Sequence, residues 1–166
     1  MKKIFLMIAV ISATILTAKA QTPAKKEFGK TLQAYFDTKN ALATDNVAKA
    51  SVGAKNLLAT LTAFPVKTLT TAQQAEWKKQ SEELKKYATP IVAEKDLKAQ
   101  RKSFENVSSA MIKLVKAVGL NSNEIYVQYC PMVKRSWLNE VEDVQNPFYG
   151  SKMYDCGEVT ETIAKK

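Results

Sequence analysis

The stretch LKAQRKSFENVSSAMIKLVKAVG, residues 97–119, carries the pattern that decides the fold. Its apolar seam consists of Leu97, Phe104, Met111, Val115 and Val118, with Arg101 and Ser108 at intervening steps. Because an α-helix turns once every 3.6 residues or so, steps of three and four place these side chains on one face. Gly119 follows the last of them, and glycine often ends a helix. We therefore predict an amphipathic helix here.

Three earlier segments repeat this pattern, at residues 28–42, 47–64 and 77–91. Cap-forming residues 44–46 separate the first two, and Pro65 ends the second. Thr71 with Gln74 resembles a capping box that opens the third. Pro90 interrupts the third pattern, and a proline there either kinks a helix or begins a new one. Four seams of similar length are best buried against one another, so we predict an up-down four-helix bundle.

The character of the chain changes after Gly119. Residues 125–129 are β-branched and aromatic, which is typical of a short strand. Turn-forming pairs follow at 146–147 and 149–150. The predicted fold is therefore mainly α: a bundle over about 27–119 carries a small irregular C-terminal β-hairpin/loop module over about 125–159. Together they form a single domain, residues 21–166.

The N-terminal 20 residues have the pattern of a secretory signal peptide. Lys2 and Lys3 precede an apolar run over residues 4–11, and Ala18-Lys19-Ala20 supplies the small residues that signal peptidase reads. The apolar run is too short for a membrane span, and no stop-transfer pattern follows it. We predict cleavage before Gln21, a periplasmic or secreted product, and no membrane span after cleavage.

Composition narrows the function classes. Removal of Lys2, Lys3 and Lys19 lowers the net charge from +9 to +6, and the remaining basic residues are scattered, with arginine only at 101 and 135. This pattern does not indicate nucleic-acid binding. The chain has no histidine, which removes the usual general base and the commonest zinc ligand. It also has no glycine-rich phosphate loop. We predict that it is not an enzyme.

Sulfur is concentrated near the C-terminus. Cys130 and Met132 stand two residues apart, a spacing that faces one side of a strand, and Met153 and Cys156 stand three apart, which faces one side of a turn. If the two segments meet, they form a four-sulfur site for a soft ion such as Cu(I). The alternative is a Cys130–Cys156 disulfide, with both methionines filling gaps in a small core.

A family resemblance enters at these residues. The motifs Tyr126–Met132, Trp137-Leu138, Asn146–Gly150 and Met153 with Cys156–Val159 resemble domain-of-unknown-function family 3347. Arg101, Phe104 and the helical layout resemble it more loosely. The Cys-Pro-Met segment is also similar to the start of a heavy-metal-binding domain found on copper and silver efflux components. The family's small secreted members in Bacteroidetes, and its fusion to adaptor subunits of heavy-metal efflux pumps, imply a role in copper or silver handling.

Two functional hypotheses follow. In the first, the chain is a periplasmic Cu(I) or Ag(I) binding protein, with Cys130, Met132, Met153 and Cys156 as ligands and a heavy-metal efflux adaptor or other envelope protein as partner. The residues expected to surround the site are Tyr129, Trp137, Phe148 and Tyr149. In the second, a disulfide holds a metal-free interaction module. Its contact patch for a partner protein or glycan consists of Tyr126, Tyr129, Trp137, Phe148 and Tyr149. The oxidation state of the cysteines separates the two.

Overall fold

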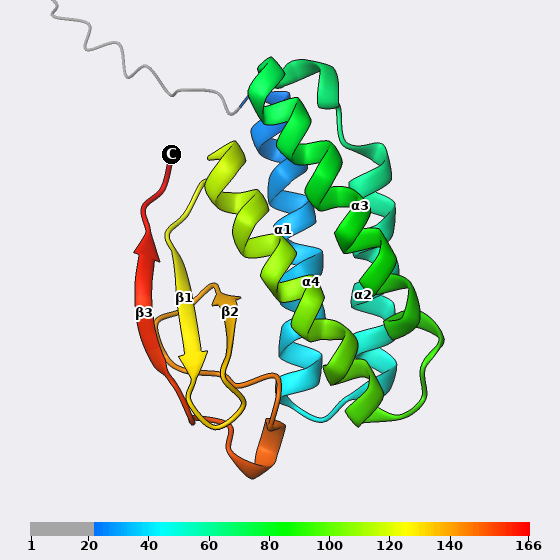
Figure 1. Ribbon diagram of the computed structural model, residues 1–166, viewed down its shortest axis with the longest axis vertical. Coiled ribbons are helices and arrows are strands. Elements are labelled where there is room, and N and C mark those ends of the chain that lie inside the picture. The colour runs from blue at the N-terminus through cyan, green and yellow to red at the C-terminus, as the bar shows by residue number, and fades with distance from the viewer. Residues whose placement is uncertain (1–21) are drawn as a thin grey trace, which may run out of the picture.

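A computed structural model describes residues 22–166, so the predicted signal peptide and its cleavage site lie outside the described residues. The bundle helices are α1 (Pro23–Ala43), α2 (Val47–Ala63), α3 (Thr71–Ala93) and α4 (Leu97–Val118). The strands are β1 (Ile125–Cys130), β2 (Arg135–Asn139) and β3 (Glu158–Ile163), and short 3-10 turns occur at η1 (Val66–Thr68) and η2 (Gly150–Lys152). The helices run alternately up and down beside the small sheet (Figure 1). The mainly α prediction is confirmed.

The helix ends follow local capping chemistry. Asn46 caps α2, its side chain accepting a hydrogen bond from the Lys49 N–H at 2.9 Å. The capping box of α3 lies at Thr70 and Gln73, one residue before the predicted pair. Gly119 ends α4 in the left-handed conformation at φ 57°, as predicted. At the site left open by the sequence, Pro90 lies in the last turn of α3 and a separate helix begins at Leu97.

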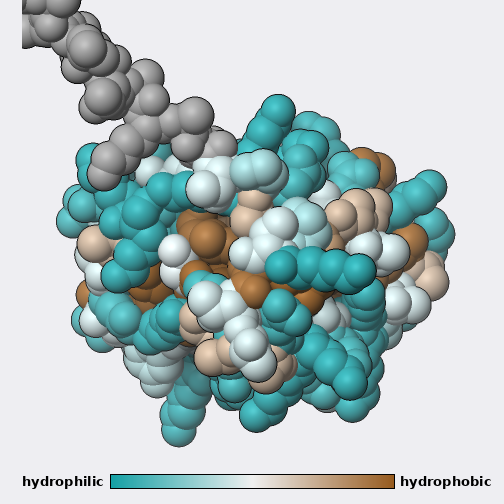
Figure 2. Space-filling view, turned by 90° about the horizontal axis from the view of Figure 1, so that it is seen from above, coloured by the Kyte–Doolittle hydropathy of each residue, from teal (hydrophilic) through white to brown (hydrophobic). Residues whose placement is uncertain are grey.

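Aromatic side chains join the helices at two levels. Phe28 of α1 and Trp77 of α3 meet Phe64, the residue that follows α2, and the Phe64 and Trp77 rings stack at a centroid distance of 3.7 Å. Tyr35 and Phe104 stack at 5.4 Å and join α1 to α4. Full burial of one such ring contributes about 2–3 kcal/mol. At the end where α1 begins and α4 ends, polar residues surround a central band of hydrophobic residues (Figure 2).

The C-terminal module is a three-stranded antiparallel sheet in the order β2-β1-β3, so a third strand extends the predicted hairpin. Its β2 edge faces the bundle and is closed by a buried relay. The Leu138 N–H donates to the Tyr35 hydroxyl at 3.0 Å, and the Tyr35 and Ser108 oxygens lie 2.7 Å apart. The Ser108 hydroxyl then donates to the Ser136 carbonyl at 3.1 Å. Burial raises the pKa of Tyr35 above its ordinary value, so the hydroxyl keeps its proton.

Two cations fasten the module to the bundle. Lys39 of α1 is fully buried and donates to Asn139 and, at 2.7 Å, to Gln145, while its Nζ lies 3.2 Å from Glu140 Oε2. Arg101 of α4 donates to the Pro147 and Leu42 carbonyls at 2.9 and 2.7 Å. It also pairs with Asp45, whose carboxylate accepts hydrogen bonds from the Ser151 N–H and hydroxyl. These contacts fix the module at the end of the bundle where α1 ends and α4 begins.

Candidate dithiol site

The two cysteines of the predicted site lie side by side. Cys130 is the last residue of β1, and Cys156 lies between η2 and β3. Because β1 and β3 are paired neighbours, their adjoining ends bring the Sγ atoms to 3.4 Å. Both thiols are free, Cys130 is fully buried and Cys156 is half-buried. The arrangement is a dithiol with one shielded sulfur and one accessible sulfur.

The surroundings make the two thiols unequal. Burial acts to raise the pKa of Cys130, but hydrogen bonds outweigh it and hold this pKa below the ordinary thiol value. They come from the Val133 N–H, the Cys156 thiol, the Met132 N–H and the Asn146 side chain. The pKa of Cys156 is raised, first because its thiol bonds to Cys130 and then by burial and negative charge nearby. Of the two thiols, Cys130 is therefore the one that ionises first, and the Cys156 thiol can then donate a hydrogen bond to its sulfur.

The turn from β1 to β2 supplies the donors to Cys130. Residues 131–134 form the turn, which the Lys134 N–H closes by donating to the Cys130 carbonyl at 2.9 Å. Lys134 takes a left-handed conformation at φ 53°. This path directs the backbone N–H groups of Met132 and Val133 at the sulfur. It also ends the strand at Cys130, so Met132 lies in the turn rather than on a strand face shared with Cys130.

Asn146 positions the second sulfur. Its side-chain N–H donates to the Cys156 carbonyl at 2.8 Å, and its Oδ1 accepts from the N–H groups of Phe148 and Tyr149 at 2.8 and 3.2 Å. The Asn146 N–H donates to the Tyr154 carbonyl at 2.7 Å. The sequence predicts this residue as part of a turn and of the family motif, but not as a support of the cysteines. An asparagine before a proline commonly organises a turn through its side chain, which is the pattern that could have identified it.

Gly157 lets the backbone after Cys156 pass close to the sheet. A Cβ at this position would lie 2.9 Å from the Tyr129 carbonyl oxygen and 3.0 Å from the Trp137 ring, and the residue has φ 151°. Only glycine fits such an approach without displacing its neighbours. Gly157 thus allows the segment that carries Cys156 to lie against the end of β1.

The predicted methionine ligands are placed differently from the cysteines. Met132 is 62% exposed in the β1–β2 turn. Met153 is half-buried at the end of η2, where its carbonyl accepts from the Cys156 N–H at 3.2 Å. No hydrogen bond joins either thioether to the cysteine pair among residues 22–166. The contact between sulfur atoms that the structure shows is the one between the two cysteines.

The predicted aromatic surround divides into two kinds. Trp137 and Phe148 are core residues, with ring centroids 5.8 Å apart, and Phe148 continues to Phe104 of α4 at 5.9 Å. Tyr129 and Tyr149 are half-buried. Trp137 reaches the site by packing against Gly157. The aromatic residues therefore support the dithiol and join it to the bundle.

The cysteine pair is not part of a larger cluster of metal-ligating side chains in the described part of the chain. Residues 22–166 contain no group of three or more His, Cys, Asp or Glu side chains that could hold a metal ion. The cysteine pair is a donor set of two soft sulfurs, which suits a monovalent soft ion better than zinc or calcium. In the same range, no helix has the length and apolarity needed to cross a membrane.

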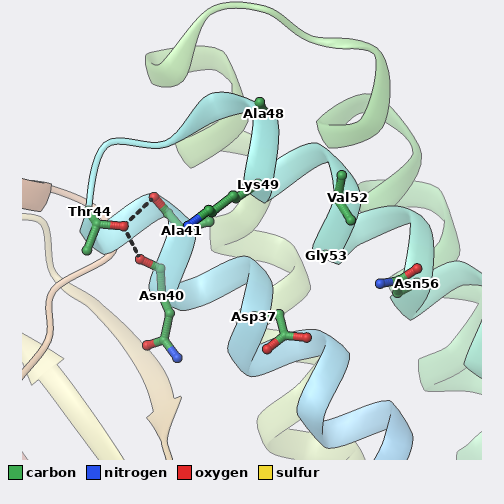
Figure 3. Close-up of a pocket in the computed structure, with 9 residues that line it drawn as sticks. All are labelled: Asp37, Asn40, Ala41, Thr44, Ala48, Lys49, Val52, Gly53 and Asn56. Carbon is green, nitrogen blue, oxygen red and sulfur yellow. Dashed lines mark hydrogen bonds between the residues drawn. The ribbon is translucent and has the colours of Figure 1, made fainter.

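Apart from the dithiol, the molecule has a concave surface between α1 and α2 (Figure 3). Its volume is about 510 Å³. The Thr44 hydroxyl donates to the backbone carbonyls of Asn40 and Ala41. The Asn40 side chain donates to Glu140 at 2.6 Å. Asp37 accepts from Gln33 at 2.9 Å. Most polar groups of this surface thus serve the fold.

Comparison with known proteins identifies the family. Residues 31–123 match the family described as protein of unknown function (DUF3347), so the chain belongs to it. The predicted family is confirmed, but the match covers the helical bundle, whereas the sequence resemblance was drawn mainly from residues 125–159. Searches of curated proteins and of solved structures gave no match.

Proposed function

We propose that the chain is a soft-metal binding protein for Cu(I) or Ag(I), with Cys130 and Cys156 as the ligands that hold the ion. The observation that carries the proposal is the 3.4 Å separation of their Sγ atoms, with the Cys130 pKa held low. Thiolates prefer soft ions, and a thiol whose pKa is lowered costs less to deprotonate when the metal binds. Met153 belongs to the turn that leads to Cys156 and is the nearest thioether along that segment.

The proposed setting is the bacterial envelope. The predicted signal peptide and the family resemblance support a periplasmic protein that is accessory to heavy-metal efflux or homeostasis. With one shielded and one half-buried sulfur, the site suits an ion that is exchanged with a partner, because the accessible sulfur offers the incoming or leaving ligand a point of attack. An efflux adaptor is the proposed partner.

Titration of the reduced protein with Cu(I) against a chromophoric chelator tests the assignment. We expect Cys130→Ser and Cys156→Ser each to weaken Cu(I) binding by at least about 100-fold, because a hydroxyl is a poor soft-metal ligand. Weaker Cu(I) binding by Met153→Leu would indicate that Met153 is a third ligand, whereas unchanged binding would indicate a packing role. Met132→Leu is the matched control at an exposed thioether. Unchanged affinity in Cys130→Ser would rule out this site.

A second candidate is a metal-free interaction module held by a Cys130–Cys156 disulfide, which the same separation favours. A disulfide needs its sulfurs at about 2.05 Å, so a small movement of one side chain would suffice. A native mass spectrum of the protein, recovered from cells without reductant, distinguishes the two. A metal adduct with both thiols present supports the first function, and a metal-free mass lower by two hydrogens supports the second.

A further inference from the structure

A basic groove lies beside the dithiol, between the first turns of α4 and the η2 turn. Its volume is about 580 Å³. Four cationic side chains line it together with one acid, and the apolar part of its wall comes from the β1–β2 turn and from the segment before η2. Its lining consists of Lys98, Arg101, Lys102, Glu105, Val133, Phe148, Tyr149 and Lys152. The four α4 residues follow helical spacing and so share one face.

Three of the four cations of the basic groove have no ion-pair partner within the described chain. Glu105 already pairs with Arg135 at 2.9 Å, and Arg101 is held by the contacts that fasten the module. The lysines at 98, 102 and 152 are exposed and form no ion pair with any residue from 22 to 166. Three unpaired cations around one concavity favour an anionic occupant.

The groove and the dithiol share their supports. Val133 lines the groove, and its N–H is a donor to the Cys130 sulfur. The Asn146 side chain bonds to the same sulfur and also accepts hydrogen bonds from the N–H groups of Phe148 and Tyr149. These two residues form part of the groove wall. A ligand in the groove would therefore lie against the segments that position the sulfur pair.

We propose that the basic groove docks an acidic peptide segment of the partner that exchanges metal with the dithiol. The role of this docking in metal exchange rests on the proposed function, whereas the binding of an acidic peptide in the groove is independent of it. The concave shape suits a chain segment better than a flat lipid surface. Seven helical steps from Lys98 to Glu105 span about 10 Å, which matches about three residues of extended peptide. A short run of Asp and Glu meets these requirements.

Fluorescence anisotropy tests the proposal with a labelled peptide of four glutamates flanked by glycines, added to the full chain at low salt. We expect the Lys98→Gln/Lys102→Gln/Lys152→Gln variant to bind at least about tenfold more weakly than the wild type. The control Lys55→Gln/Lys67→Gln/Lys79→Gln removes the same charge from exposed lysines elsewhere and should change binding by less than about twofold. Wild-type binding should also weaken as salt is raised.

Equal losses in the two triple variants would overturn the proposal, because they would mean a response to net charge alone. Groove-dependent binding to phosphatidylglycerol vesicles, with no binding to the peptide, would also overturn it in favour of a membrane surface. The Cys130→Ser/Cys156→Ser variant should keep its peptide affinity. A protein that binds the peptide at the groove but binds no Cu(I) would refute the proposed function and leave the docking surface standing.

Discussion

The buried lysine between α1 and the C-terminal module should make the stability of the protein depend on pH. Burial lowers the pKa of Lys39 from 10.5 to about 8, and the charge of Glu140 only partly offsets this effect. Between these two values the unfolded chain binds the proton and the folded chain does not. The free energy of unfolding must therefore rise as pH increases through this window.

The size of the effect follows from the two pKa values. At pH 7 the shift costs the folded state about 3 kcal/mol, and at pH 9.5 the remaining cost is about 1.4 kcal/mol, so the gain over this range is about 2 kcal/mol. Above pH 10 Tyr35 acts in the opposite direction, because its raised pKa leaves the folded state protonated while the unfolded state ionises. The useful range therefore ends near pH 9.5.

Urea unfolding of the wild type and of Lys39→Met, both reduced, at pH 7 and pH 9.5 measures this contribution. The thiols titrate in both proteins, so the difference between the two isolates the lysine. We expect the wild type to gain about 2 kcal/mol relative to the variant on going to the higher pH. Lys55→Met, at an exposed position on α2, should show no such gain. A pH response shared by wild type and Lys39→Met to within about 0.5 kcal/mol would refute the reasoning.

Three further substitutions test the packing of the module by thermal or urea unfolding. Gly157→Ala should destabilise by about 1–3 kcal/mol because its Cβ would meet backbone and indole, whereas Gly29→Ala, with open space in α1, should stabilise by about 0.5–1 kcal/mol; equal effects would contradict the close approach. Tyr35→Phe should lower the free energy of unfolding by about 1–3 kcal/mol, because it leaves the buried Leu138 N–H without an acceptor. Tyr126→Phe, which removes an exposed hydroxyl, should lower it by less than about 0.5 kcal/mol, and similar losses in the two variants would show that the relay does not stabilise the module. Arg101→Lys should lower Tm, because one ammonium cannot reach three acceptors on separate segments, and an unchanged Tm would argue against that clamp.

The bundle could be predicted because its information is local. The apolar steps of 97–119 and the left-handed stop at Gly119 depend on near neighbours in the chain, and both appear in the structure. Even the one-residue offset of the capping box, from Thr71 to Thr70, reflects two threonines that compete for the same role. Helix periodicity and capping are properties that a sequence displays directly.

The candidate site was harder to predict because its geometry depends on distant contacts. The strand β3, which follows Cys156, has no fully buried residue, so the sequence shows no clear apolar alternation that would predict its pairing with β1. Lys39 and Asn139 meet across about a hundred residues. The placement of Met132 in a turn depends on where β1 ends, and strand ends are set by the turn chemistry that follows.

The relay that Tyr35 and Ser108 form along β2 has a consequence for self-association. With that side of the sheet occupied, the outer side of β3 is the one edge that residues 22–166 leave open to strand addition. Two copies that joined there would pair β3 with β3 and use up the open edge of each. Such growth ends at a closed pair, since a fibre requires two free edges on every unit. By occupying the β2 edge, the hydroxyl of one buried tyrosine thus limits association through this sheet to two copies.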